Sequence, residues 1–250
     1  MNSPPLAYAH NGGVLSLGER WRLALDAVGT RLALLRTQPA TATAAPDWDA
    51  GALADLAPPT GVAVAAVHAL AAQAQPDWLT AHALRTYAWA AALARSGDLS
   101  FDRELLFAAC LLHDVGLVPA GAEPARECFA LRGARYAQAA LPPVGWTPAR
   151  ATAVAQAIAL HLDVRVAIER GAEAHLLHAG AGVDVLGLRW PEIAAPVRQY
   201  VLGQYPRPGF KRALCDCLRP EIRRNPHTRI GVYGRWLGML SAIRKSPLSD

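Results

Sequence analysis

Two histidines and two aspartates have the residue types and spacing to bind a metal ion: His82, the adjacent pair His113 and Asp114, and Asp184. A divalent first-row ion accepts imidazole nitrogen and carboxylate oxygen, and a catalytic site keeps one position open for water beside three or four such ligands. Adjacent residues of a regular helix point about 100° apart, so His113 and Asp114 can reach one ion only where their helix ends. The pattern predicts a divalent metal site with these four side chains as ligands.

Such a site would activate water. A bound dication lowers the pKa of its water toward neutrality and polarises the electrophile. Asp114 would accept or return the proton, because an acid–base group must lie within hydrogen-bonding reach. We expect His161 to be a hydrogen-bond donor at the site, a substrate-orienting group or an extra ligand, and Arg85 to be a cation on the substrate side. The alternatives are a histidine that merely ends its helix and an arginine in a structural ion pair.

Helices must position these residues. His82 lies in a helix that we expect to begin with Asp77 as its N-cap. A second predicted helix begins near Ser100 and ends at Gly116, where glycine would adopt the left-handed conformation. Gly180 and Gly182 would allow close approach of the helix that carries Asp184. The other predicted helices span residues 124–141, 148–161, 172–185, 191–202, 208–222 and 228–243.

The N-terminal part of the chain has a different pattern. Apolar residues at helical spacing predict an amphipathic helix over residues 19–35. The segment 37–59 is rich in proline, threonine and alanine and is interpreted as a linker. The sequence therefore predicts an N-terminal helix and linker in residues 1–59, one catalytic domain over residues 60–240 and a tail at 241–250.

Composition favours an all-α protein, because alanine is abundant and β-branched and aromatic residues are few. The formal net charge is +5, and the basic residues concentrated after Arg198 are interpreted as a solvated face, so no nucleic-acid partner is expected. The four cysteines show no C-x-x-C spacing, which indicates reduced thiols in a cytoplasmic protein. No segment approaches about 18 consecutive apolar residues, so no membrane partner is expected. Nucleotide-binding glycine motifs are absent from the sequence.

The order of the four candidate ligands resembles the HD superfamily of metal-dependent hydrolases, and the surrounding sequence is similar to its cyanamide hydratase-like branch, which has bacterial members. The motifs that carry the resemblance are TAHALRTY (80–87), CLLHDVG (110–116), CFALRGA (128–134), AIALH (157–161), GAGVDVLG (180–187) and YPRPGFK (205–211). The resemblance implies an HD-domain helical bundle in which His82, His113, Asp114 and Asp184 bind the metal. It implies Zn²⁺, with Fe²⁺ or Mn²⁺ as alternatives, and addition of water to a nitrile, as when cyanamide gives urea.

Other readings of the same residues remain open. HD phosphohydrolases that act on nucleotides use the same metal core, but often carry a lysine or histidine shortly after His-Asp-x-Gly. Here Leu117 and Val118 follow, which favours a small neutral substrate. An HD-like binding module with a vestigial metal site is the non-enzymatic alternative. His175 or His178 would bind a second iron in a di-iron oxygenase, although the full six-ligand pattern is not evident. The predicted N-terminal helix could pack across a homodimer.

Overall fold

The computed structural model describes residues 6–36, 47–118 and 127–250, and within these ranges it is built from α-helices without a β-strand. A single isolated bridge joins Val14 to Thr228. The all-α prediction is confirmed. The helices are α1 Leu17–Arg36, α2 Ala50–Ala54, α3 Val62–Ala74, α4 Asp77–Ser96, α5 Arg103–Leu112, α6 Phe129–Ala140, α7 Pro148–Leu160, α8 Ala172–Leu186, α9 Ala195–Gln204, α10 Phe210–Arg224, α11 Arg229–Trp236 and α12 Met239–Arg244.

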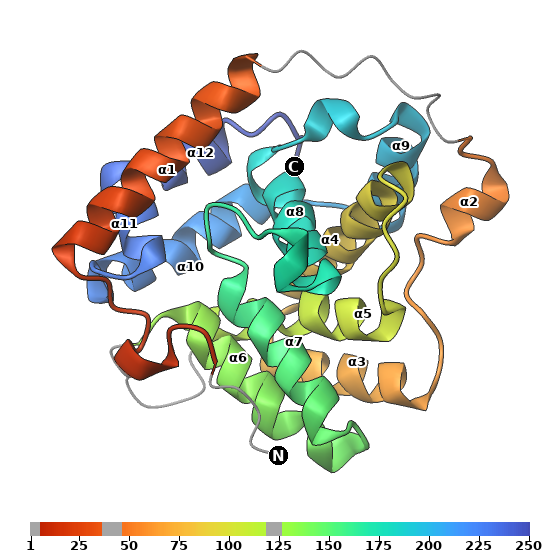
Figure 1. The fold of residues 1–250 in the computed structure, drawn as a ribbon. Helices are drawn as coiled ribbons and strands as arrows, with labels where there is room; N and C mark the ends of the chain where they lie inside the picture. The colour runs from red at the N-terminus through yellow and green to blue at the C-terminus, as the bar shows by residue number, and fades with distance from the viewer. Residues whose placement is uncertain (1–5, 37–46, 119–126) are drawn as a thin grey trace.

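Helix α4 lies at the centre of the bundle, with α8 against it (Figure 1). Most of α4 is buried, and its central stretch from Ala88 to Ala94 contains five alanines. Alanine favours the helix and leaves room for a neighbouring backbone. Gly180 in α8 uses that room, because a Cβ atom at this position would lie 2.3 Å from the carbonyl oxygen of Thr86. The expectation of close helix approach is confirmed for Gly180 but is wrong for Gly182, where the nearest atoms to an added Cβ belong to Leu188 and not to another helix.

Replacing Gly180 by alanine should lower the free energy of unfolding by about 1–3 kcal/mol, because the added methyl group must push α8 away from α4. Gly203→Ala is the matched control: Gly203 also lies in a helix, but a Cβ there meets nothing within 4 Å. That change should be neutral or stabilise by up to about 1 kcal/mol. Urea denaturation of both variants measures the difference. Equal stability of the two variants would contradict the close α4–α8 packing.

Helix α1 lies along the outside of the molecule against α11 (Figure 1). Its Ala24 is buried with Leu15 and Val232 in a small separate cluster. The sequence prediction of a helix over residues 19–35 is confirmed, with α1 slightly longer at both ends. The predicted linker contains the short helix α2, which the side chain of Asp49 caps; residues 37–46 lie outside the described part of the chain.

Several predicted helix ends need correction. Pro76 occupies the N-cap position of α4 and Asp77 is its first residue, so Asp77 is not the cap. The predicted start of a helix at 124 falls outside the described residues, and α6 begins at Phe129. The helix expected over 228–243 is divided into α11 and α12, because Gly238 adopts a positive φ of 66° between them. The expected tail begins inside α12, and its Leu248 is buried in the core.

Candidate metal centre

Two histidines and one aspartate converge in the interior: His82 from α4, and His113 and Asp114 from the end of α5. The two histidine Nε2 atoms are 3.2 Å apart. Asp114 Oδ2 lies 3.6 Å from Nε2 of His82 and 3.3 Å from Nε2 of His113. The three side chains can therefore offer one ligand atom each within 4.8 Å of one another. We call this set the donor group.

The end of α5 allows His113 and Asp114 to face the same point. His113 is the C-cap and keeps helical angles, whereas Asp114 has left the helix with φ −106° and ψ 5°. This confirms that the helix ends at the pair. The predicted left-handed conformation of Gly116 is wrong, because Gly116 is not among the positive-φ glycines. Glycine is needed there because a Cβ would lie 2.1 Å from the carbonyl oxygen of Phe129.

The hydrogen bond made by Nδ1 of each site histidine determines that its Nε2 faces the donor group. His113 Nδ1 lies 2.7 Å from the carbonyl oxygen of Cys110, and His161 Nδ1 lies 2.6 Å from that of Ile158. A carbonyl oxygen only accepts, so each Nδ1 donates a proton and each neutral ring presents a bare Nε2. His82 Nδ1 likewise donates to Asp184 Oδ2, at 2.7 Å. This is the arrangement in which histidines bind metal ions.

A cation fits these residues, since the Nε2 lone pairs of His82 and His113 face each other and a carboxylate oxygen with no donor between them. Buried acceptors without a donor are costly. In the metal-free protein a proton can take the cation's place: burial alone would lower the pKa of His113, but the Asp114 carboxylate outweighs it and the pKa is raised. Burial would raise the pKa of Asp114, but His113 outweighs it and holds that pKa well below its usual range.

Asp184, the fourth ligand expected from sequence, lies behind His82 and is not part of the donor group. It is fully buried and accepts hydrogen bonds from Arg85 Nε at 2.8 Å and Trp89 Nε1 at 2.9 Å, with Arg207 Nη1 at 3.0 Å. Burial would raise its pKa, but Arg85 and His82 outweigh it and the pKa is lowered. Two guanidinium groups and an indole thus occupy its oxygens, and the structure places it as the hydrogen-bond partner that orients His82.

The sequence predicts Arg85 as a cation on the substrate side, but in the structure its side chain points to Asp184. Its side chain is fully buried, and the guanidinium binds Asp184 and the carbonyl oxygen of Pro206, at 3.1 Å from Nη1. Its guanidinium carbon lies 5.0 Å from the ring centre of Phe210. Arg85 is therefore the structural ion-pair residue. Arg207 also pairs with Asp184 and is only 4 % exposed, so the prediction that the basic residues after Arg198 form a solvated face is wrong for this residue.

His161 comes close to the donor group from the end of α7, as the sequence predicts. Its Nε2 lies 3.7 Å from Asp114 Oδ1, the carboxylate oxygen that faces away from His82 and His113. Burial first, and then His113, lower the pKa of His161 to about 3. His161 is thus neutral at pH 7, and its Nε2 can accept a hydrogen bond but not donate one.

The surroundings of the donor group are aromatic. The ring of Phe210 stacks on His82 with centres 5.0 Å apart, and the ring of Phe129 lies 5.7 Å from His161. Asp114, at 6 %, is the most exposed member of the donor group. Any small molecule would therefore approach from the Asp114 side.

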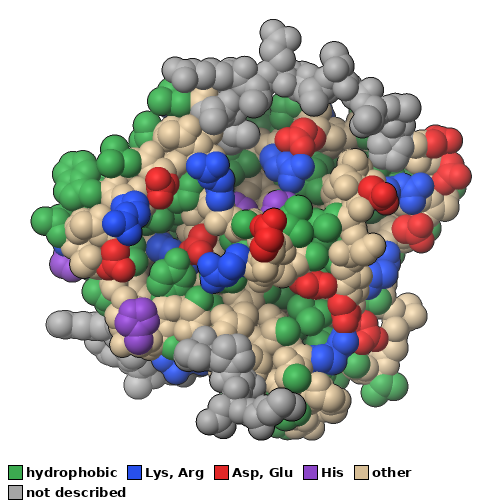
Figure 2. Space-filling model, viewed as in Figure 1, with side chains coloured by type: hydrophobic (Ala, Val, Ile, Leu, Met, Phe, Trp, Pro, Cys, Tyr) green, Lys and Arg blue, Asp and Glu red, His purple; other side chains and the backbone are tan. Residues whose placement is uncertain are grey.

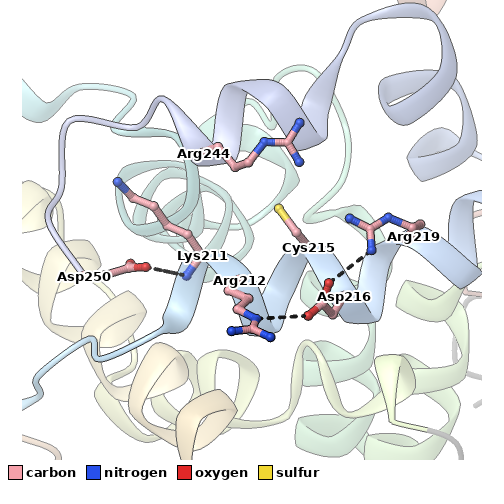
Figure 3. A pocket seen from close by; sticks show the side chains of 7 residues that line it. All are labelled: Lys211, Arg212, Cys215, Asp216, Arg219, Arg244 and Asp250. Carbon is pink, nitrogen blue, oxygen red and sulfur yellow. Dashed lines mark hydrogen bonds and ion pairs between the residues drawn. The ribbon is translucent and has the colours of Figure 1, made fainter.

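A surface cavity of about 320 Å³ lies away from this centre, between α10 and α12 (Figure 3). Its lining side chains are Lys211, Arg212, Cys215, Asp216, Arg219, Arg244 and Asp250. Arg212 and Arg219 both pair with Asp216, and Lys211 Nζ donates to the carbonyl oxygen of Ser246. Three of the lining cations therefore already have partners within the chain, and none of the donor group lines the cavity.

Residues 79–183 match the family model of the HD domain. This segment is similar to an HD domain. The matched segment includes His82, His113, Asp114 and His161 and ends one residue before Asp184. HD domains are generally those of metal-dependent hydrolases, and the His-His-Asp donor group of this one agrees with that class. Comparison with curated proteins gave no match. No helix in the described part of the chain has the length and apolar character needed to cross a bilayer.

Proposed function

We propose that this HD-domain protein is a metal-dependent enzyme that adds water to a small neutral molecule, with cyanamide and related nitriles as the substrate class. The observation that carries the proposal is the convergence of two bare histidine Nε2 atoms and the Asp114 carboxylate in a buried site. A divalent ion bound there, for which we propose Zn²⁺ with Fe²⁺ or Mn²⁺ as alternatives, would supply activated water at neutral pH and polarise the electrophile.

The side chains divide into holding and proton-handling roles. His82, His113 and Asp114 Oδ2 would hold the ion, and Asp184 would keep His82 in the correct tautomer and orientation. Asp114 Oδ1 and His161 Nε2 are two acceptors 3.7 Å apart, so a water molecule or an N–H group that donates to one of them lies close to the other. We assign proton transfer to Asp114 and orientation of water or substrate to His161.

The charges around the site favour a neutral substrate over a phosphate ester. A phosphate group requires cations in its site. Arg85 is fully engaged by Asp184, and Arg132 pairs with Glu221 at 2.7 Å and donates to the carbonyl oxygen of Gly116. Phe129 and Phe210 contact the site histidines instead. Among the described residues, the site therefore offers a small compound such as a nitrile an apolar wall, and offers a phosphate no unpaired arginine.

The test combines elemental analysis of the purified full chain with a urea-release assay on cyanamide. We expect roughly one divalent ion per chain and urea formation, both lost in His113→Ala. His175→Ala is the matched control, because His175 Nδ1 donates to the carbonyl oxygen of Val166 outside the donor group, so metal content and turnover should persist.

Two outcomes would overturn the proposal in different ways. Metal-loaded protein that releases no urea but hydrolyses nucleotides or other phosphate esters would replace the substrate class with that of the phosphohydrolases. Protein that binds no divalent ion, and whose thermal stability is unaffected by a chelator, would replace the enzyme with an HD-like binding module.

A further inference from the structure

Helix α1 exposes a row of large apolar side chains that its packing against the body leaves largely uncovered. The exposed fractions are Leu17 57 %, Trp21 57 %, Leu25 67 %, Val28 46 % and Leu32 47 %. We call these five residues the α1 stripe. At 100° per residue they fall on one face of the helix. In Figure 2 a line of hydrophobic side chains follows the upper-left edge of the molecule, where Figure 1 places α1.

The α1 stripe is separate from the face that attaches α1 to the body. Attachment uses Ala24, which is 8 % exposed and packs with Leu15 and Val232. Trp21 contacts the ring of Trp236 on α11, with centres 5.1 Å apart, and Trp236 is itself 38 % exposed. The apolar surface therefore continues from α1 onto α11. A contiguous exposed apolar patch of this kind marks an interaction site.

The spacing of the stripe fits a helix as the partner. From Trp21 through Leu25 and Val28 to Leu32 the apolar residues recur at intervals of four, three and four, which is the seam of a two-helix coiled coil. An irregular loop as partner does not need this alternation. The α1 stripe is therefore best suited to a second helix packed along α1.

Two glycines give an independent indication of a close helix neighbour. Gly18 and Gly29 lie within α1, where glycine costs about 1 kcal/mol relative to alanine. A Cβ atom at either position would meet nothing within 4 Å, so the packing of this chain does not require them. They are 11 residues apart, which places them on one side of the helix, directly beside the stripe. Small residues there would let a second backbone approach closely.

A second copy of α1 fits this surface. In an antiparallel pair, Trp21 faces Leu32 of the second copy and Leu25 faces Val28, so large rings meet smaller side chains. Arg31 then lies beside Ala24 of the second copy, which avoids like charges across the seam. The stripe together with Trp236 exposes on the order of 600 Å² of apolar surface, most of the roughly 800 Å² per partner that a standard interface buries.

We propose that the protein is a homodimer in which the α1 stripe of one copy packs along the α1 stripe of the other. Such a twofold contact uses the same patch on both copies and closes the assembly. It covers the apolar row on α1 and explains the two glycines that the single chain does not need. The interface involves neither the donor group nor the metal, so it does not depend on the proposed reaction.

The test is the mass of the full chain in solution, by sedimentation equilibrium or light scattering. Wild type should have twice the 26.6 kDa mass of one chain. Leu25→Glu should weaken dimerisation by at least roughly 100-fold, because each copy would bury a carboxylate without a partner. Val62→Glu is the matched control: Val62 on α3 is 88 % exposed outside the stripe, and this variant should remain dimeric. Circular dichroism and thermal unfolding verify that both variants are folded.

Three results would overturn the homodimer. One is wild-type protein that is monomeric up to about 100 µM. The second is a folded Leu25→Glu variant that dimerises as tightly as wild type. The third is monomeric wild type that co-sediments with vesicles containing anionic lipid, while Leu25→Glu does not; the α1 stripe would then be a membrane-contact surface.

Discussion

Asp184→Ala should lower the free energy of unfolding by about 3–5 kcal/mol, since removing one partner of a buried ion pair leaves the other charge unpaired. Asp184 is the common acceptor for Arg85, Arg207 and Trp89, all of them buried. Without its carboxylate, Arg85 keeps no carboxylate partner in the interior, and Arg207 keeps only Asp250 Oδ1, at 3.9 Å from its Nη2. Urea denaturation of the metal-free protein measures this loss. The decrease in the free energy of unfolding should be larger than that caused by most single substitutions.

The same change should weaken metal binding by about 10- to 100-fold, because His82 loses the carboxylate that accepts its Nδ1 proton. Equilibrium dialysis at a fixed zinc concentration gives the affinity. The control is His175→Ala, which should change neither stability nor affinity comparably, since His175 is only half-buried and its bond is to a backbone carbonyl. A loss far beyond 100-fold would indicate that Asp184 binds the ion directly, and an Asp184→Ala protein as stable as wild type would contradict the buried cluster.

The chain's helical architecture was predictable because local physics dictates it. Alanine-rich segments with apolar residues at helical spacing predict α4, α5, α7 and α8 close to where they occur. Helix ends were less predictable, since glycine serves two purposes that sequence alone cannot distinguish. Gly116 is present for a close approach to Phe129, whereas Gly238 is present for its positive φ. The sequence therefore predicts a left-handed conformation at Gly116, which is wrong, and gives no sign of the helix break at Gly238.

The residues of the candidate site were predictable from the sequence. Which of them face the metal position and which lie behind it was not. His113 and Asp114 are adjacent at a helix end, so their convergence follows from the sequence. Asp184 has the same chemistry as Asp114, and only the three-dimensional structure shows that arginines surround it. One of them, Arg207, precedes α10 and reaches Asp184 across 23 positions of sequence. The sequence spacing of histidines and aspartates identifies residues that can bind a metal. It does not show which of the two aspartates pairs with a buried arginine instead.

Asp114→Asn should reduce turnover by about 10²- to 10⁴-fold, the range expected when a group that transfers protons in the reaction is lost. Asparagine preserves the volume of Asp114 but removes the only carboxylate of the donor group and with it the proton acceptor at Oδ1. Metal affinity should fall too, because a charged ligand becomes neutral. Steady-state urea release and metal content measure both effects. Asp216→Asn, on the exposed surface of α10, is the control and should resemble wild type.

The metal-free Asp114→Asn protein should also lose a pH-dependent part of its stability. In wild type the pKa of His113 is raised above its ordinary 6.5 by Asp114, although burial opposes this. The resulting stabilisation is present in full below the ordinary pKa of histidine and disappears as the pH rises through the raised value. Wild type should therefore lose more stability between about pH 5 and pH 8 than the variant does. Equal pH profiles, or a variant that retains wild-type metal content and turnover, would remove Asp114 from the centre of this site.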